Sequence, residues 1–206
     1  MTAASDPQVQ NPAPEEDPGQ GTPAMTENAY DLIYRSMGNA LIAWQLVEGA
    51  HFRLFRKLLG APEELSPLVY FSIESFDTRR KMLHRVAQCF LADPKFKALR
   101  GQWDNLNKEL KDANDNRNKI AHYDIGSDVL NITESAEGGV EIEFGPPRLR
   151  PLGYNRVSQL DGRTPDQEAH NLSHAELNSY RDEFRSLAKL LTEFYVAIDS
   201  VKYDRT

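Results

Sequence analysis

Residues 93–122, DPKFKALRGQWDNLNKELKDANDNRNKIAH, contain the most regular helical pattern in the chain. Its apolar residues recur at alternating intervals of three and four, which places them on one face of a helix. The stripe consists of Phe96, Leu99, Trp103, Leu106, Leu110, Ala113, Arg117 and Ile120. Asp93 followed by Pro94 supplies an N-cap and a first-turn proline. Arg117 is the one charged member of the stripe, so its position needs a structural or a chemical reason.

Two long helices are expected before this segment, because residues 27–59 and 67–90 show the same three-four periodicity. Gly60 ends the first of them, since glycine readily adopts the left-handed conformation that terminates many helices. Ser66, which precedes a proline, supplies an N-cap for the second helix. A bend in the second helix is expected near Ser75.

A last helix is expected to begin at Ser173, because Ser173 and Glu176 form a capping box. Before it, the segment of about 125–153 changes to an alternating pattern, which predicts a small β-hairpin. The alternating apolar residues are Leu130, Ile132, Val140, Ile142 and Phe144. Four amphipathic helices joined mostly by short links predict a mainly α fold. We therefore expect an antiparallel four-helix bundle with the hairpin inserted before the last helix.

The chain has 206 residues and 40% hydrophobic content, which suits one domain with a sizeable core. Residues 1–25 are instead rich in proline, glutamine and acidic residues, and they offer little apolar surface to offset the entropy of ordering. We expect a disordered acidic tail over 1–25, followed by a single helical domain over 26–206.

The formal net charge is −7, and four acidic residues without any Lys or Arg in the first 24 positions account for −4 of it. The remainder, −7 minus −4, carries −3, so its net field does not attract polyanions. A nucleic acid would have to bind a local basic patch. The candidate clusters are Arg53/Arg56/Lys57, Arg79/Arg80/Lys81/Arg85 and Arg148/Arg150.

Cys89 is the only cysteine, so no internal disulfide can form, which is typical of a reducing compartment. The N-terminus lacks a basic region followed by an apolar run, and no apolar stretch is long enough to cross a bilayer. The expected location is the cytoplasm, without contact with a membrane.

A charged residue on the seam of a bundle must be paired, hydrogen-bonded or placed at an opening, because an isolated buried charge costs several kcal/mol. Glu48 and His51 are the polar breaks in the first helical stripe. If the first and third helices are antiparallel neighbours, Glu48 is expected to hold Arg117 in place. The alternative is an ion pair with a purely structural role.

Asn118 and His122 are four residues apart and share a helix face, while Arg117 lies about 100 degrees away on the wheel. These three residues therefore converge at the border between core and surface, where a second subunit could cover them. A simpler interpretation is that Lys119 and His122 merely end the helix, where its dipole favours positive charge.

The sequence RNKIAH at 117–122 resembles the R-x4-6-H signature of HEPN domains, including the polar residue that often follows the arginine. The resemblance in fold covers about residues 27–203. It implies a helical bundle, usually homodimeric, in which the motifs of two subunits meet in one cleft. Active members of this family are metal-independent endoribonucleases, often toxins or phage-defence effectors.

Carried onto this chain, the resemblance gives His122 the proton transfers at the ribose 2′-hydroxyl or the leaving oxygen. Arg117 would stabilise the charge that develops on phosphorus. Asn118 would orient either Arg117 or His122. No metal or other cofactor is then required, because RNA carries its own nucleophile. The cations expected to contact the RNA are Lys119, Arg79 and Arg80.

Some family members that pair with an antitoxin carry R-x4-H-x-Y, whereas here Tyr123 follows His122 directly and position 124 is Asp. Modification of Tyr123 by such a partner is therefore not expected on the motif alone, although the residue belongs to the candidate site. Other members lack nuclease activity and serve as binding or assembly modules. Two alternatives to an RNase thus stay open, a noncatalytic dimer locked by these polar residues and an RNA-binding module without turnover.

Overall fold

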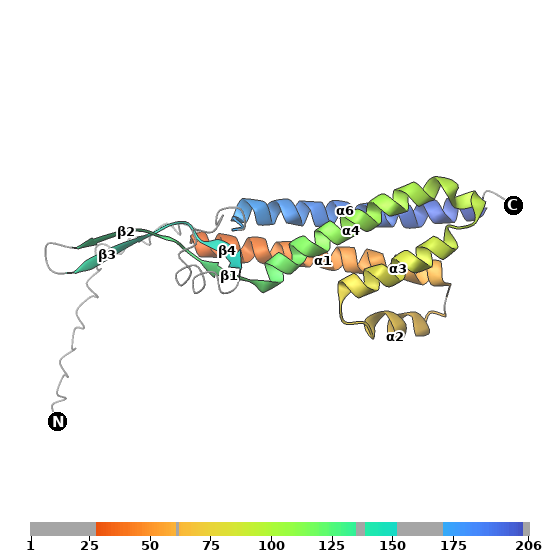
Figure 1. Cartoon of the computed structure of the whole chain (residues 1–206), viewed down its shortest axis with the longest axis horizontal. Helices are drawn as coiled ribbons and strands as arrows, with labels where there is room; N and C mark the ends of the chain where they lie inside the picture. Colours follow the sequence, from red (N-terminus) through yellow and green to blue (C-terminus); the bar gives the residue numbers. More distant parts are fainter. Residues whose placement is uncertain (1–27, 61, 135–138, 152–170, 204–206) are drawn as a thin grey trace, which may run out of the picture.

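The computed structural model describes residues 28–60, 62–134, 139–151 and 171–203. Within these ranges the fold is mainly α, with two antiparallel strand pairs before the last helix (Figure 1). The helices are α1 (Ala29–Leu59), α2 (Leu65–Phe71), α3 (Phe76–Phe90), α4 (Lys97–His122) and α6 (His174–Tyr203), and a short 3-10 turn, η1 (Pro94–Phe96), precedes α4. The tail predicted for 1–25 lies outside the described residues.

The second predicted helix is in fact two helices, α2 and α3. The expected bend is a complete break, after which Ser75 caps α3 by accepting a hydrogen bond from the amide of Thr78 at 3.5 Å. The prediction that Ser66 caps this segment is wrong, because Ser66 lies inside α2 and donates its hydroxyl to the carbonyl of Pro62 at 3.1 Å. The chain therefore reverses direction between α1 and α2 and again between α2 and α3, whereas one helix after α1 would have given a single reversal.

This extra reversal changes how the long helices run. Because α2 makes the return path, α1 and α6 lie side by side and parallel, and α4 runs against both (Figure 1). Two contacts fix the parallel register: the rings of Trp44 and Phe184 are 5.3 Å apart, and further along Lys57 pairs with Asp199. Within the described residues, the expected antiparallel four-helix bundle is thus corrected to five helices, of which the longest two, α1 and α6, are parallel.

The core lies between α1, α4 and α6, with α3 closing one side. The apolar stripe predicted for α4 is confirmed, because each of its members except Arg117 is buried. The largest fully buried side chains include Trp103, Phe55, Phe184, Leu54, Leu110 and Leu191. Burying each such side chain contributes about 1.5–3 kcal/mol, so this seam is the main source of stability.

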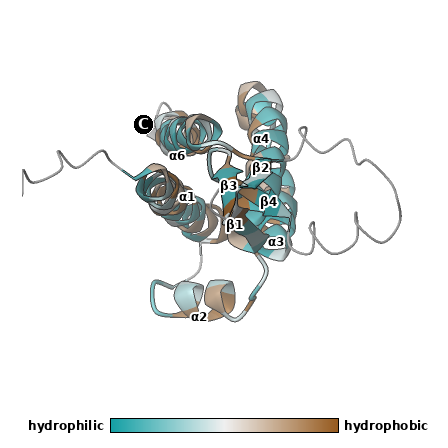
Figure 2. Ribbon diagram, turned by 90° about the vertical axis from the view of Figure 1, so that its left-hand side faces the viewer, coloured by the Kyte–Doolittle hydropathy of each residue, from teal (hydrophilic) through white to brown (hydrophobic). Residues whose placement is uncertain are grey.

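Helix α2 stands apart from the other helices, as the view down the bundle shows (Figure 2). Its Tyr70 is fully buried and lies with its hydroxyl 2.7 Å from Nδ1 of His51 on α1. Leu68 and Phe71 point to solvent, with 69% and 60% of their surface exposed. The buried Tyr70, together with the ring of Phe71, which lies 5.2 Å from that of Phe52 on α1, therefore anchors this short helix to the bundle.

The predicted β-hairpin is confirmed, and it consists of two successive antiparallel strand pairs. Strand β1 (Tyr123–Gly126) continues directly from α4 and pairs with β4 (Arg148–Pro151). Beyond them β2 (Val129–Glu134) pairs with β3 (Val140–Phe144), and this second pair projects away from the bundle (Figure 1). The predicted turn lies largely outside the described residues. A bridge between Leu149 and Leu172 ties the strands to the start of α6.

The capping box at the start of α6 is confirmed. The amide and the hydroxyl of Ser173 donate to Oε2 of Glu176 at 2.7 and 2.8 Å, and the amide of Glu176 donates back at 3.3 Å. We expect Ser173→Ala to lower the free energy of unfolding by about 1 kcal/mol, because it leaves the amide of Glu176 without its acceptor. Urea denaturation measures this loss. Ser179→Ala, further along α6, is the control and should leave stability nearly unchanged; equal losses would contradict the role of the cap.

Candidate functional site

The HEPN-like residues occupy the last two turns of α4. Arg117 is partly buried, and its Nη1 donates to Oδ1 of the neighbouring Asn118 at 3.3 Å. Its Nε is buried and has no hydrogen-bond partner among the described residues. No carboxylate in the described part of the chain lies within 4.0 Å of this guanidinium as an ion-pair partner. Arg117 is therefore a cation that keeps unused donors.

His122 is the last residue of α4 and is exposed. Tyr123 begins β1, is partly buried and packs against the core. Burial raises the pKa of Tyr180 on α6, and the nearby Glu183, Glu176 and Tyr123 raise it further. Tyr123 therefore lies on the side of α6. The imidazole of His122 can thus reach a ligand in solvent, whereas the phenol next to it is turned inward.

Three more basic residues lie at this end of the bundle, one on α4 and two on β4. Lys119 donates its Nζ to Oδ1 of Asn116 at 3.3 Å. In the strand pair that follows His122, Arg150 lies opposite Asp124 and Arg148 opposite Gly126. The sequence identified these two arginines as a basic cluster, but did not connect them with the motif, because only the strand register brings them together.

The expected support of Arg117 by Glu48 is not formed. Oε1 of Glu48 instead lies 3.2 Å from Nη2 of Arg79, which comes from α3. The guanidinium of Arg79 also lies over the ring of Tyr70, 5.1 Å from its centre. The sequence could not foresee this pairing, because it depends on α3 lying beside the middle of α1.

His51 lies in the same group as Arg79 and Tyr70 and is fully buried. Its Nδ1 contacts the hydroxyl of Tyr70, while its Nε2 has no partner among the described residues. Burial, reinforced by the charges of Arg79 and Arg80, lowers the pKa of His51 from 6.5 to about 3. Burial also raises the pKa of Tyr70. Both groups are therefore neutral at pH 7, and His51 is not accessible to RNA.

Arg79 and Arg80 do not fit the expected role in RNA binding. Arg80 is buried, and its Nη atoms donate to Asp77 and to Asn107 at 2.8 Å each. Asn107 lies ten residues before Arg117 on α4, which corresponds to about 15 Å along the helix axis. The structure therefore separates the predicted site residues into two groups, of which only the one at the end of α4 faces solvent.

A hollow of about 260 Å³ between α4 and α6 leads towards the motif. It reaches Asn116, the residue before Arg117, and its walls carry Glu109, Asp112 and Glu183. Three carboxylates repel a phosphate backbone, so this hollow is not a path for RNA. An RNA strand would have to approach from the end of the bundle, past His122 and the β1–β4 strands.

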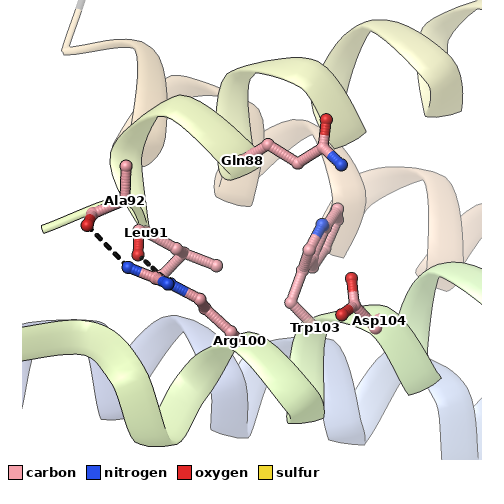
Figure 3. Close-up of a pocket in the computed structure, with 6 residues that line it drawn as sticks. All are labelled: Gln88, Leu91, Ala92, Arg100, Trp103 and Asp104. Atoms are coloured by element: carbon pink, nitrogen blue, oxygen red, sulfur yellow. Dashed lines mark hydrogen bonds between the residues drawn. The ribbon is translucent and has the colours of Figure 1, made fainter. Parts of the chain in front are cut away.

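Another hollow, of about 340 Å³, lies between α3 and α4 (Figure 3). Arg100 stretches along one side and donates to the carbonyls of Leu91 and Ala92 at 2.6 Å each. Trp103 forms the opposite side, and its indole donates to Nδ1 of His84 at 3.1 Å. Arg100 therefore satisfies carbonyls at the end of α3, and its charge is committed to the fold.

Within the described residues, no group of three or more His, Cys, Asp or Glu side chains is arranged to hold a metal ion. None of the described helices is both long and apolar enough to span a bilayer. Comparison of the chain with family models, with curated proteins and with solved structures finds no match. Its function is therefore inferred from its own residues.

Proposed function

We propose that this protein is a metal-independent endoribonuclease of the HEPN type, a toxin or phage-defence effector that acts at a cleft shared by two copies. The observation that carries the proposal is Arg117, a half-buried guanidinium that has an amide neighbour but no carboxylate partner among the described residues. Keeping such a charge costs stability, and a site that binds phosphate would account for that cost.

The reaction needs a proton acceptor, a proton donor and fixed positive charge. His122 of one copy accepts the proton of the ribose 2′-hydroxyl, and the 2′-oxygen forms a bond with phosphorus. The bond from phosphorus to the 5′-oxygen breaks, and His122 of the second copy donates a proton to that oxygen. Arg117, oriented by Asn118, stabilises the negative charge on the phosphoryl oxygens. The products are a 2′,3′-cyclic phosphate and a 5′-hydroxyl.

Charge around the motif supports an approach of RNA from the end of the bundle. Lys119 and Arg148 lie on this side, whereas the carboxylates of the α4–α6 hollow line the other. The binding of RNA should therefore weaken as salt is added, because phosphate contacts release counterions. In a toxin, a partner protein that covers this end would act as the antitoxin.

The test is incubation of the purified chain with end-labelled RNA in EDTA. We expect cleavage without a divalent metal, a 2′,3′-cyclic phosphate at the new end, and loss of cleavage in His122→Ala. His174→Ala is the matched control, since His174 is also exposed and lies at a helix end. Cleavage that persists in His122→Ala, or that depends on added metal, would contradict the proposal.

A second candidate function is a noncatalytic homodimer that serves as an interaction or RNA-binding module. It is favoured by the exposed apolar residues of the hairpin, among them Ile132 and Val140, which are 63% and 64% exposed. RNA that binds without being cut would support the binding module. Absence of both binding and cleavage would leave protein interaction as the function.

A further inference from the structure

The outer strand pair presents an apolar face that nothing in the described chain covers. The register places Ile132 opposite Ile142 and Val129 opposite Phe144. Cross-strand partners share a face, and side chains alternate along a strand, so Ile132, Val140, Ile142 and Phe144 lie on one side. A register shift between Val129 and Asn131 lets both Val129 and Leu130 join this side, and Glu134, opposite Val140, lies at its end. We call this the hairpin face: Val129, Leu130, Ile132, Val140, Ile142 and Phe144, each 45–64% exposed.

The opposite side of the same strands is polar. Asn131 pairs with Glu143 and Thr133 with Glu141. An isolated two-stranded hairpin is only marginally stable in water and needs a hydrophobic face that packs on something. A contiguous exposed apolar patch on a soluble protein commonly marks an interaction site. We therefore expect a binding partner to cover the hairpin face.

A second uncovered apolar surface lies on α1. Tyr34, Ile42 and Leu46 are 54%, 60% and 53% exposed, and their spacing follows one ridge on the side of α1 opposite the core. Gly38 lies on the same ridge, where an added Cβ would meet nothing within 4 Å. We call Tyr34, Ile42 and Leu46 the α1 stripe. It gives α1 two apolar sides, of which the bundle covers one.

The two surfaces match in length and position. From Tyr34 to Leu46 the helix advances about 18 Å, and a five-residue strand such as β3 spans about 17 Å. The hydroxyl of Tyr30 lies 2.9 Å from Oγ of Ser127, so the α1 stripe begins where the hairpin leaves the bundle. The hairpin projects away from the helices and does not lie on its own α1 (Figure 1).

We propose that a second copy of this chain covers both surfaces: the hairpin face of each copy packs on the α1 stripe of the other, about a two-fold axis. Such an interface is self-complementary, and therefore closes as a dimer. Nine side chains that each lose about 80 Å² amount to roughly 700 Å² per copy, or about 1,400 Å² in all. That is within the range of about 1,200–2,000 Å² for stable interfaces.

Charge is consistent with this partner. The hairpin carries Glu141 and Glu143 on the side that faces away from the partner's helix. Residues 34–46 contain no acidic side chain and one basic one, Arg35. These glutamates therefore stay in solvent, and no acidic side chain of residues 34–46 has to be buried under the hairpin. The other exposed apolar patch, on α2, lies at the opposite end of α1 and is outside the reach of a hairpin placed in this way.

The inference rests on the homodimer of the proposed function, but it is tested by mass and not by activity. Light scattering during size-exclusion chromatography should give twice the chain mass of 23.4 kDa for the full chain. Ile142→Glu and Ile42→Glu should each reduce it to one chain mass, because a buried charge opposes association. Leu68→Glu on α2 is the matched control and should remain a dimer. All three residues are exposed, so circular dichroism should show unchanged folding.

Cross-linking identifies the surfaces directly. In a Cys89→Ser background, chains with Ile142→Cys are mixed with chains with Ile42→Cys and oxidised. We expect covalent dimers in the mixture and few in either variant alone. A monomeric wild-type protein, a dimer unaffected by Ile142→Glu, or cross-links between two Ile142→Cys chains would overturn the inference. A dimer that does not cut RNA leaves it intact and contradicts only the nuclease.

Discussion

Arg117→Met is expected to lower the rate of RNA cleavage by about 100- to 1,000-fold, the usual cost of removing one donor that stabilises transition-state charge. The same change should alter the free energy of unfolding by less than about 1 kcal/mol, and in the stabilising direction. The reason is that the buried Nε of Arg117 has no partner among the described residues, so its removal relieves an unmet donor. Single-turnover kinetics and urea denaturation measure the two effects.

Arg117→Lys is the control for charge. Lysine keeps the positive charge but loses the planar fork of donors, so partial activity is expected. A structural ion pair would behave differently, because breaking a buried pair destabilises a protein by about 3–5 kcal/mol. If Arg117→Met unfolds that much more easily, or cuts RNA as the wild type does, Arg117 is a structural residue.

Lowering the pH from 7 to 5 is expected to reduce the free energy of unfolding by about 2 kcal/mol through His51 alone. The pKa of His51 is about 3 in the folded chain and near 6.5 when unfolded. Between these values the unfolded state binds the extra proton. The stabilisation is therefore complete above about pH 6.5 and is lost as the pH falls towards 3.

His51→Gln separates this effect from other titrations. Glutamine can still contact the hydroxyl of Tyr70, but it does not ionise. The pKa of Asp77 is also lowered, by hydrogen bonds with Lys81 and Arg80, but its ordinary value of 3.8 lies below the range tested. Urea denaturation at pH 7, 6 and 5 should therefore show a smaller slope for His51→Gln. Equal slopes in the two proteins would contradict the burial of a neutral imidazole.

The elements that depend on nearby residues were predictable. The stripe of α4, the capping box at Ser173 and the glycine that ends α1 were each recognised from spacing, and the left-handed Gly60 confirms the last of them. The hairpin was recognised from its alternating pattern for the same reason. Helix periodicity, caps and turns are local, because they involve residues a few positions apart.

The break between α2 and α3 was harder to predict, although its residues are also local. Apolar spacing runs on through Ser75, so periodicity alone suggests one bent helix. The break decides the direction of every later helix, and it makes α1 and α6 parallel where an antiparallel pair was expected. A small local ambiguity thus changed the arrangement of the whole bundle.

The candidate site shows the same division. By itself, the sequence determined that Arg117, Asn118 and His122 end one helix, with the arginine on the seam and the histidine at the border with solvent. Only the tertiary structure decided which charges meet: Glu48 pairs with Arg79, and Arg148 and Arg150 lie on the strand that pairs with the one following His122. The physical reason is that side-chain pairing across helices and strands depends on register and direction, which are set by packing over the whole chain and not by spacing along it.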